Sequence, residues 1–149
     1  MTLVQLDDPR SITFGYRGDY APDERPIITV EFAAVDSDNA LTGTYTTGVL
    51  VDSGATTSAL SIYAASELGL DLSDADRYPR FDMTGVVPGA KRPATEAEVL
   101  VELGGQWLPI PVAFTLDMDP TTATLGRRGV FDNVIFAFGH AERAVLCAV

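Results

Sequence analysis

Apolar and polar residues alternate along most of the chain, which is the pattern of β-strands that bury one face. Ile28, Val30 and Phe32, for example, alternate with Thr29 and Glu31. Strands are predicted over residues 11–16, 28–32, 41–51, 81–84, 95–103, 108–114, 134–138 and 144–149. The pattern therefore predicts a mostly β protein.

One segment follows a helical period instead. Over residues 61–70, Ile62, Ala65 and Leu68 recur at helical spacing, and Gly69 can end the helix. A second short turn or helix is expected near residues 128–133.

Prolines and glycines suggest how two of the strands are connected. A turn-forming stretch, residues 85–89, separates two strand-like arms and predicts a hairpin. Pro109 and Pro111 lie between the alternating apolar residues of 108–114, and because proline has no N–H to donate, they predict an edge strand there.

Length and charge limit the organisation and the partners. The 149 residues show no repeat or linker, so we expect one domain over residues 1–149, with residues 1–24 as an N-terminal arm of uncertain role. The net charge of −11 makes nucleic acids and anionic membranes unfavourable partners. No apolar run approaches the roughly 18 residues of a membrane span, and the start does not resemble a signal peptide, so a cytoplasmic location is expected.

The residue inventory excludes several kinds of site. The chain has one histidine, His140, in a predicted turn, and one cysteine, Cys147, in an apolar strand where a packed thiol is expected. Neither a Cys-His zinc site nor a Ser-His-Asp triad can be built well from this set. We therefore expect no metal and no cofactor.

The strongest chemical signal is a carboxylate at the end of a buried strand. The apolar run Val49-Leu50-Val51 leads into Asp52, which is followed by Ser53 and Gly54. An ionised carboxyl in apolar surroundings loses hydration, so chains tolerate one mainly where it is bonded or used. A short hydroxyl and a glycine beside it suit a hydrogen-bonded carboxylate.

Three stretches, in this order, make the chain resemble the retropepsin-like aspartic peptidases, a single-lobe family. The first is the apolar run with Asp-Ser-Gly-Ala at residues 49–55, the second the glycine-containing hairpin around residues 85–89, and the third Leu-Gly-Arg at residues 125–127 with the short segment after it. Together they cover about residues 27–149. Asp-Ser-Gly alone occurs often by chance, but its position after a buried strand and before Leu-Gly-Arg makes the combination more specific.

The resemblance implies a fold, an activity and a set of residues. It implies a single-lobe acid-protease barrel with one main helix and a flap hairpin. It implies a homodimeric aspartic endopeptidase that hydrolyses polypeptides with a water held between two Asp52 carboxylates, one from each subunit. Its active-site loop would comprise Ser53, Gly54, Ala55 and Thr56 beside Asp52, its substrate-binding flap Gly85, Val86, Val87, Pro88 and Gly89, and its structural support Leu125, Gly126 and Arg127.

Two other interpretations remain open at this point. The chain could be a catalytically inactive retropepsin-like module for dimerisation or peptide binding, although the intact Asp-Ser-Gly counts against this. It could also be an unrelated acidic β-barrel, in which Asp52 is a surface turn residue. The environment of Asp52 and the mass in solution distinguish these interpretations.

Overall fold

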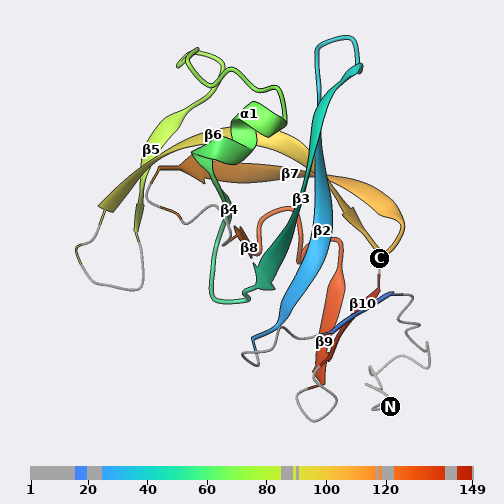
Figure 1. Ribbon diagram of the computed structural model, residues 1–149. Coiled ribbons are helices and arrows are strands. Elements are labelled where there is room, and N and C mark those ends of the chain that lie inside the picture. Colours follow the sequence, from blue (N-terminus) through green and yellow to red (C-terminus); the bar gives the residue numbers. More distant parts are fainter. Residues whose placement is uncertain are drawn as a thin grey trace.

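The computed structural model describes residues 16–19, 25–84, 89, 91–116, 118, 123–139 and 144–148. Most of them lie in strands, as the alternating pattern predicts (Figure 1). The elements are β1 (Tyr16–Asp19), β2 (Ile27–Val35), β3 (Leu41–Val51), β4 (Ser58–Ser61), α1 (Ile62–Glu67), β5 (Arg80–Thr84), β6 (Lys91–Leu103), β7 (Gln106–Thr115), β8 (Ala123–Leu125), β9 (Ile135–Gly139) and β10 (Ala144–Ala148).

Six of the strands close into a barrel. The larger sheet has the order β2-β3-β8-β4-β7-β6-β5, and an additional pairing of β2 with β6 closes it, which leaves β5 outside the ring. The alternating apolar side chains point inward, and Phe32, Val49, Val101, Ile110 and Leu125 are each at most 1% exposed. The mostly β, single-barrel prediction is confirmed.

The short strand β8 lies between two strands that come much earlier in the chain. It runs parallel to the end of β3, with Val51 opposite Leu125, and antiparallel to β4, with Ala59 opposite Thr124. The loop that joins β3 to β4 must therefore pass over the end of β8. This arrangement positions residues 52–57, which we call the Asp52 loop.

The helix forms where its period predicts, but it is shorter than residues 61–70. The side chain of Ser61 caps its N-terminus by accepting from the Tyr63 N–H at 3.3 Å. At the other end Gly69 adopts φ +69°, and the Thr42 hydroxyl donates to the Leu68 carbonyl at 2.7 Å. The helix stops early because its last turn packs directly on β3, where a side chain at Gly43 would collide with the helix backbone.

One other prediction is wrong. β7 is not an edge strand, because it pairs with β6 on one side and with β4 on the other. The prolines are tolerated because β4 contacts β7 only from Val112 onward, past Pro109 and Pro111. The short turn or helix expected near residues 128–133 is present as hydrogen-bonded turns. Within the described chain, no helix is long and apolar enough to cross a membrane.

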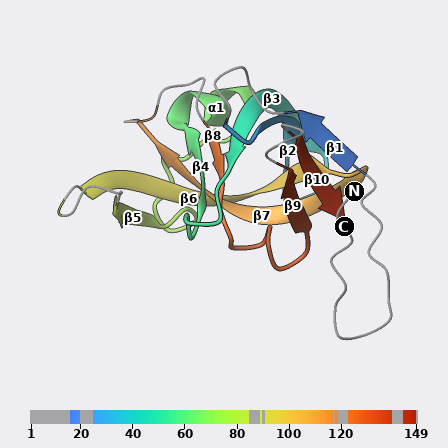
Figure 2. The ribbon, with the colours of Figure 1, turned by 90° about the horizontal axis from the view of Figure 1, so that it is seen from below.

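A second, three-stranded sheet lies at one end of the barrel, with β10 between β1 and β9 (Figures 1 and 2). The register places Cys147 of β10 between Tyr16 of β1 and Phe136 of β9. Of the predicted N-terminal arm, residues 1–24, only β1 lies within the described residues. The predicted strands near the C-terminus are confirmed as β9 and β10.

Cys147 is the packed thiol that the sequence predicts. It is 1% exposed, and burial raises its pKa from 9.0 to about 12. Between pH 9.0 and about 12 the thiol of the folded protein therefore stays mostly protonated, whereas a free thiol would be a reactive thiolate.

This burial predicts a pH-dependent loss of stability in alkali. Between pH 9.0 and about 12 the unfolded chain ionises Cys147 while the folded chain does not, so the free energy of unfolding falls as the pH rises through this window. Denaturant unfolding of wild type and Cys147→Ala across this range measures the effect. The wild type should lose stability more steeply, since the other titrating groups are common to both proteins; equal slopes would contradict a buried, protonated thiol.

Candidate active site

Asp52 is the first residue after β3, and backbone hydrogen bonds fix its position. Its N–H donates to the Leu125 carbonyl at 3.0 Å, and the N–H of Val51 donates to the Pro26 carbonyl at 3.0 Å. Both bonds continue the strand pairing to the very end of β3. Val49 and Val51, near the end of β3, are buried, so the strand holds the Asp52 carboxylate at the rim of the barrel, where Asp52 is half-buried.

The carboxylate also shapes its own turn. The Gly54 N–H donates to Asp52 Oδ1 at 2.8 Å, and the Ala55 N–H donates to the Asp52 carbonyl at 3.2 Å. A side chain at Gly54 would place its Cβ 3.1 Å from Asp52 Oδ1, so a glycine suits this close approach. One carboxylate oxygen is held by the backbone, and no described residue donates a hydrogen bond to Asp52 Oδ2.

The predicted support, residues 125–127, lies against the Asp52 loop. The Arg127 N–H donates to the Ala55 carbonyl at 2.9 Å, and the Arg127 side chain donates from Nη2 to the Thr56 hydroxyl at 3.2 Å. The next residue, Arg128, donates its N–H to the Thr56 carbonyl at 2.9 Å. Residues far apart in the sequence therefore hold the outer half of the loop in place.

Gly126 makes the closest contact between the two segments. A Cβ there would lie 2.5 Å from the backbone carbonyl carbon of Thr57, so only glycine fits. Its N–H donates to the buried Ser58 hydroxyl at 3.0 Å. Ser58 is not among the residues predicted from the sequence, where its one signal is a hydroxyl residue at the start of a largely apolar strand.

Three of the six residues of the Asp52 loop are exposed. Ser53, Gly54 and Thr56 are exposed and Ala55 is half-buried. The Ser53 hydroxyl bonds to none of the residues that the structure describes, whereas the Thr56 hydroxyl accepts from Arg127. Ser53 is therefore available to a group outside the described part of this chain.

The predicted hairpin is present as β5 and β6. Its strands pair from Arg80 opposite Thr95 to Thr84 opposite Lys91. Gly89, at the turn, has φ +81° and open space around it. The other expected flap residues, Gly85, Val86, Val87 and Pro88, lie outside the described residues.

A cavity of about 390 Å³ lies at the base of this hairpin. Its walls come from β5, β6 and the end of β7, together with Ile62, the first residue of α1. None of its lining residues belongs to the Asp52 loop, so the cavity is not the candidate catalytic centre. The hairpin base is also tied to the segment after Gly126, because Arg128 and Glu96 form an ion pair at 3.0 Å. Both side chains are partly exposed, so this pair contributes at most about 1 kcal/mol.

Comparisons with known proteins identify the fold. Neither known protein families nor curated proteins match the sequence. Among solved structures, the chain is similar to a retropepsin-like aspartic protease from Rickettsia conorii, with a TM-score of 0.57 and 17% identity over 88% of this chain and 96% of that one. A further match is EIAV protease in complex with an inhibitor, with a TM-score of 0.46 and 20% identity over 72% of this chain and 86% of that one. The first match, together with the barrel topology, shows a retropepsin-like fold.

Proposed function

We propose that this chain, which has the retropepsin-like fold, is a homodimeric aspartic endopeptidase in which each subunit supplies one Asp52. The observation that carries the proposal is the Asp52 loop itself. It presents a carboxylate at the end of a rigid strand and is fixed by bonds to Leu125, Arg127 and Arg128. A purely structural barrel has no need of a half-buried carboxylate held in this way.

The proposed chemistry needs two carboxylates. One of them, ionised, accepts a proton from a water molecule, whose oxygen attacks the carbonyl carbon of the peptide bond. The other, protonated, donates its proton to the carbonyl oxygen, which gives a tetrahedral gem-diol. Cleavage of the C–N bond then follows as a proton passes to the leaving nitrogen. Because like charges about 3 Å apart do not both ionise, the pair shares one proton.

A second chain is required because the sequence contains a single Asp-Ser-Gly. In a symmetric dimer, a two-fold axis beside Asp52 would supply the second carboxylate. Ser53, whose hydroxyl has no partner among the described residues, would bond across that axis to the opposite loop. No feature of the site favours the alternative, an inactive binding module.

The proposed substrate is an extended polypeptide between the Asp52 loop and the β5–β6 hairpin, which would act as the flap. Such a peptide is bound by strand addition, with alternate side chains entering pockets. The sequence of the proposed flap includes Val86, Val87 and Pro88. We therefore expect hydrophobic side chains to be preferred beside the cleaved bond, which cleavage of a peptide library measures.

The dimer requirement predicts a characteristic concentration dependence. Hydrolysis of casein or a peptide library, assayed from acid to neutral pH, should show a rate per chain that rises with protein concentration until the dimer is saturated. A statine-type peptide should inhibit it. A rate per chain that stays constant under conditions where sedimentation shows only monomer would contradict the proposal.

A further inference from the structure

The cavity at the base of the β5–β6 hairpin takes no part in the proposed catalysis, yet it has the size of a ligand site. Its volume of about 390 Å³ lies within the range of pockets that hold small molecules, roughly 300–1,000 Å³. Three parts of the chain enclose it, namely the hairpin, the end of β7 and the start of α1. Paired strands and a helix end therefore form its walls.

One face of the sheet forms much of the cavity wall. Arg80 of β5 is opposite Thr95 of β6, and Thr95 is opposite Phe114 of β7, so these three side chains form one row across three strands. Asp82, two residues further along β5, lies on the same face as Arg80. The apolar part of the lining consists of Ile62, Phe81, Pro93, Ala94, Phe114 and Leu116.

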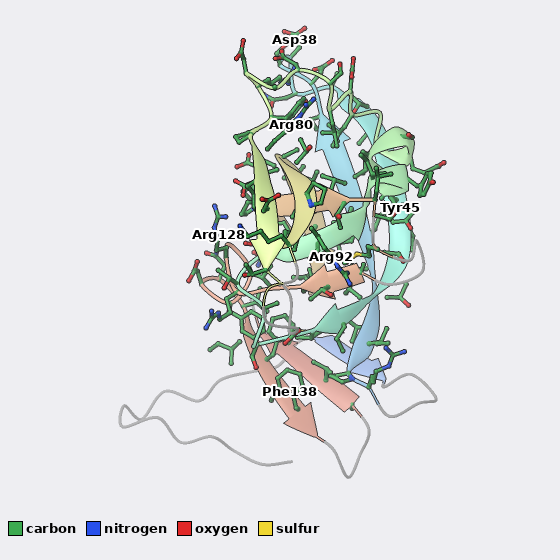
Figure 3. All side chains as sticks on the ribbon, turned by 90° about the vertical axis from the view of Figure 1, so that its left-hand side faces the viewer. Asp38, Tyr45, Arg80, Arg92, Arg128 and Phe138 are labelled. Atoms are coloured by element: carbon green, nitrogen blue, oxygen red, sulfur yellow. The ribbon has the colours of Figure 1, made fainter. Side chains whose placement is uncertain are left out.

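Two opposite charges stand beside this apolar lining. Arg80, labelled in Figure 3, and Asp82 both line the cavity and are exposed, and in the described part of the chain no ion pair joins them. The Arg80 guanidinium donates from Nη2 to the Ser73 carbonyl at 3.4 Å, whereas no described residue donates a hydrogen bond to the Asp82 carboxylate. Both side chains therefore keep hydrogen-bonding capacity for a molecule in the cavity.

This arrangement suits a small zwitterion that has an apolar side chain. The Arg80 guanidinium can donate to a carboxylate, and the Asp82 carboxylate can accept from an ammonium group. Two residues along a strand span roughly 7 Å, which matches two opposite charges carried by one small molecule. The net charge of −11 repels a purely anionic ligand, whereas a zwitterion carries no net charge.

We propose that this cavity binds a free hydrophobic α-amino acid, or a short hydrophobic peptide with both ends free. The ligand carboxylate binds Arg80, its ammonium group binds Asp82, and its side chain packs against Phe114 and Leu116. Binding of this class of ligand goes beyond the proposed function and does not depend on it. Hydrolysis of polypeptides does release molecules of this class, so the ligand would be a product of the proposed reaction.

A ligand in the cavity would also act on the hairpin. It contacts both the hairpin and the barrel, so it holds the base of the hairpin in place. Glu96, next to Thr95, forms the ion pair with Arg128, whose N–H donates to the Thr56 carbonyl of the Asp52 loop at 2.9 Å. This step rests on the proposed function, in which the hairpin is the flap. A flap held at its base admits an extended peptide less readily, so the bound ligand should raise KM and leave kcat unchanged.

The first test is an NMR titration of the full chain with L-phenylalanine, which both detects binding and locates it. Amide resonances of β5, β6 and the end of β7 should shift with a Kd on the order of 1 mM, as expected for a ligand of this size. Glycine has both charges but no apolar side chain, and N-acetyl-L-phenylalanine amide has the side chain but no charge. Each should bind at least about tenfold more weakly.

Variants of the two charged residues test the assigned contacts. Asp82→Asn and Arg80→Gln should each raise the Kd for phenylalanine about tenfold, because each loses a charge-assisted hydrogen bond. Both side chains are exposed, so the fold should survive. Asp38→Asn, in the turn between β2 and β3, is the matched control and should bind phenylalanine as wild type does. The inference is overturned if phenylalanine shifts no resonance of the three strands, if N-acetyl-L-phenylalanine amide binds equally well, or if neither variant weakens binding.

A peptidase assay separates this site from the proposed function. Phenylalanine above its Kd should raise KM severalfold for wild type but not for Asp82→Asn. An equal rise in both proteins would mean that phenylalanine competes at the active site, and an unchanged KM would mean that the cavity does not act on the hairpin; either result would overturn the coupling. A chain that binds phenylalanine in the cavity but cleaves no peptide would overturn the proposed activity and leave the binding site intact.

Discussion

Asp52→Asn is expected to abolish peptide-bond hydrolysis while the barrel stays folded. The amide cannot accept a proton from water or share one with its partner, so both copies of the proposed catalytic group are lost at once. Removal of a group that acts directly in the reaction typically costs about 10⁴-fold or more in kcat. The amide oxygen can still accept the Gly54 N–H, so the turn should survive.

The measurement is kcat on a peptide cleaved by wild type, together with the thermal unfolding midpoint. Asp38→Asn is the matched control, because Asp38 is exposed in the turn between β2 and β3, at the other end of β3 from Asp52. Figure 3 shows Asp38 at one end of the molecule. It should retain wild-type activity. If Asp52→Asn kept more than a small fraction of the activity, hydrolysis would have to come from other groups, and the proposed mechanism would be wrong.

The second large effect is expected at Gly126, which has no side chain that could take part in the reaction. Gly126→Ala would place a methyl group 2.5 Å from the Thr57 backbone, where no flexible side chain can move aside. The two segments must separate, which weakens the Ser58–Gly126 hydrogen bond as well. We expect the free energy of unfolding to fall by about 3 kcal/mol, and the unfolding midpoint to fall by about 10 °C.

The rate of hydrolysis by Gly126→Ala should fall by more than its loss of stability explains. The displaced loop carries Asp52, and a misplacement of about 1 Å can cost about 100-fold in rate even in the molecules that remain folded. Gly105→Ala is the comparison, because Gly105 has φ +82° but open space around it. The Gly105→Ala variant measures the free-energy cost of adding a side chain at a glycine where no collision occurs. A Gly126→Ala protein as stable and active as Gly105→Ala would show that the close approach does not hold the site.

Much of the fold could be predicted because a strand that buries one face shows apolar and polar residues in alternation along the sequence. β3 occupies residues 41–51 as predicted, because the turn that ends it is visible locally in the sequence as Asp52-Ser53-Gly54. The sequence pattern predicts the helix but makes it too long. Its end depends on contact with Thr42 and Gly43, which lie outside the helical segment.

The features that could not be predicted depend on which strands, far apart in the sequence, pair with each other in the fold. The prolines of β7 suggested an edge, yet β4 pairs with that strand just beyond them. Likewise Ser58 is only a serine in the sequence, and its role depends on Gly126, which β8 brings beside it from the other end of the chain. Only the family resemblance points to Leu-Gly-Arg, because its bonds to the Asp52 loop are long-range.

The central claim is that two chains share one catalytic centre, and the binding stoichiometry of a statine-type peptide tests it most directly. Isothermal titration of the dimer should give one peptide bound for every two chains, with binding lost or much weakened in Asp52→Asn. One peptide bound per chain, or undiminished binding to Asp52→Asn, would contradict a centre formed by the two Asp52 carboxylates.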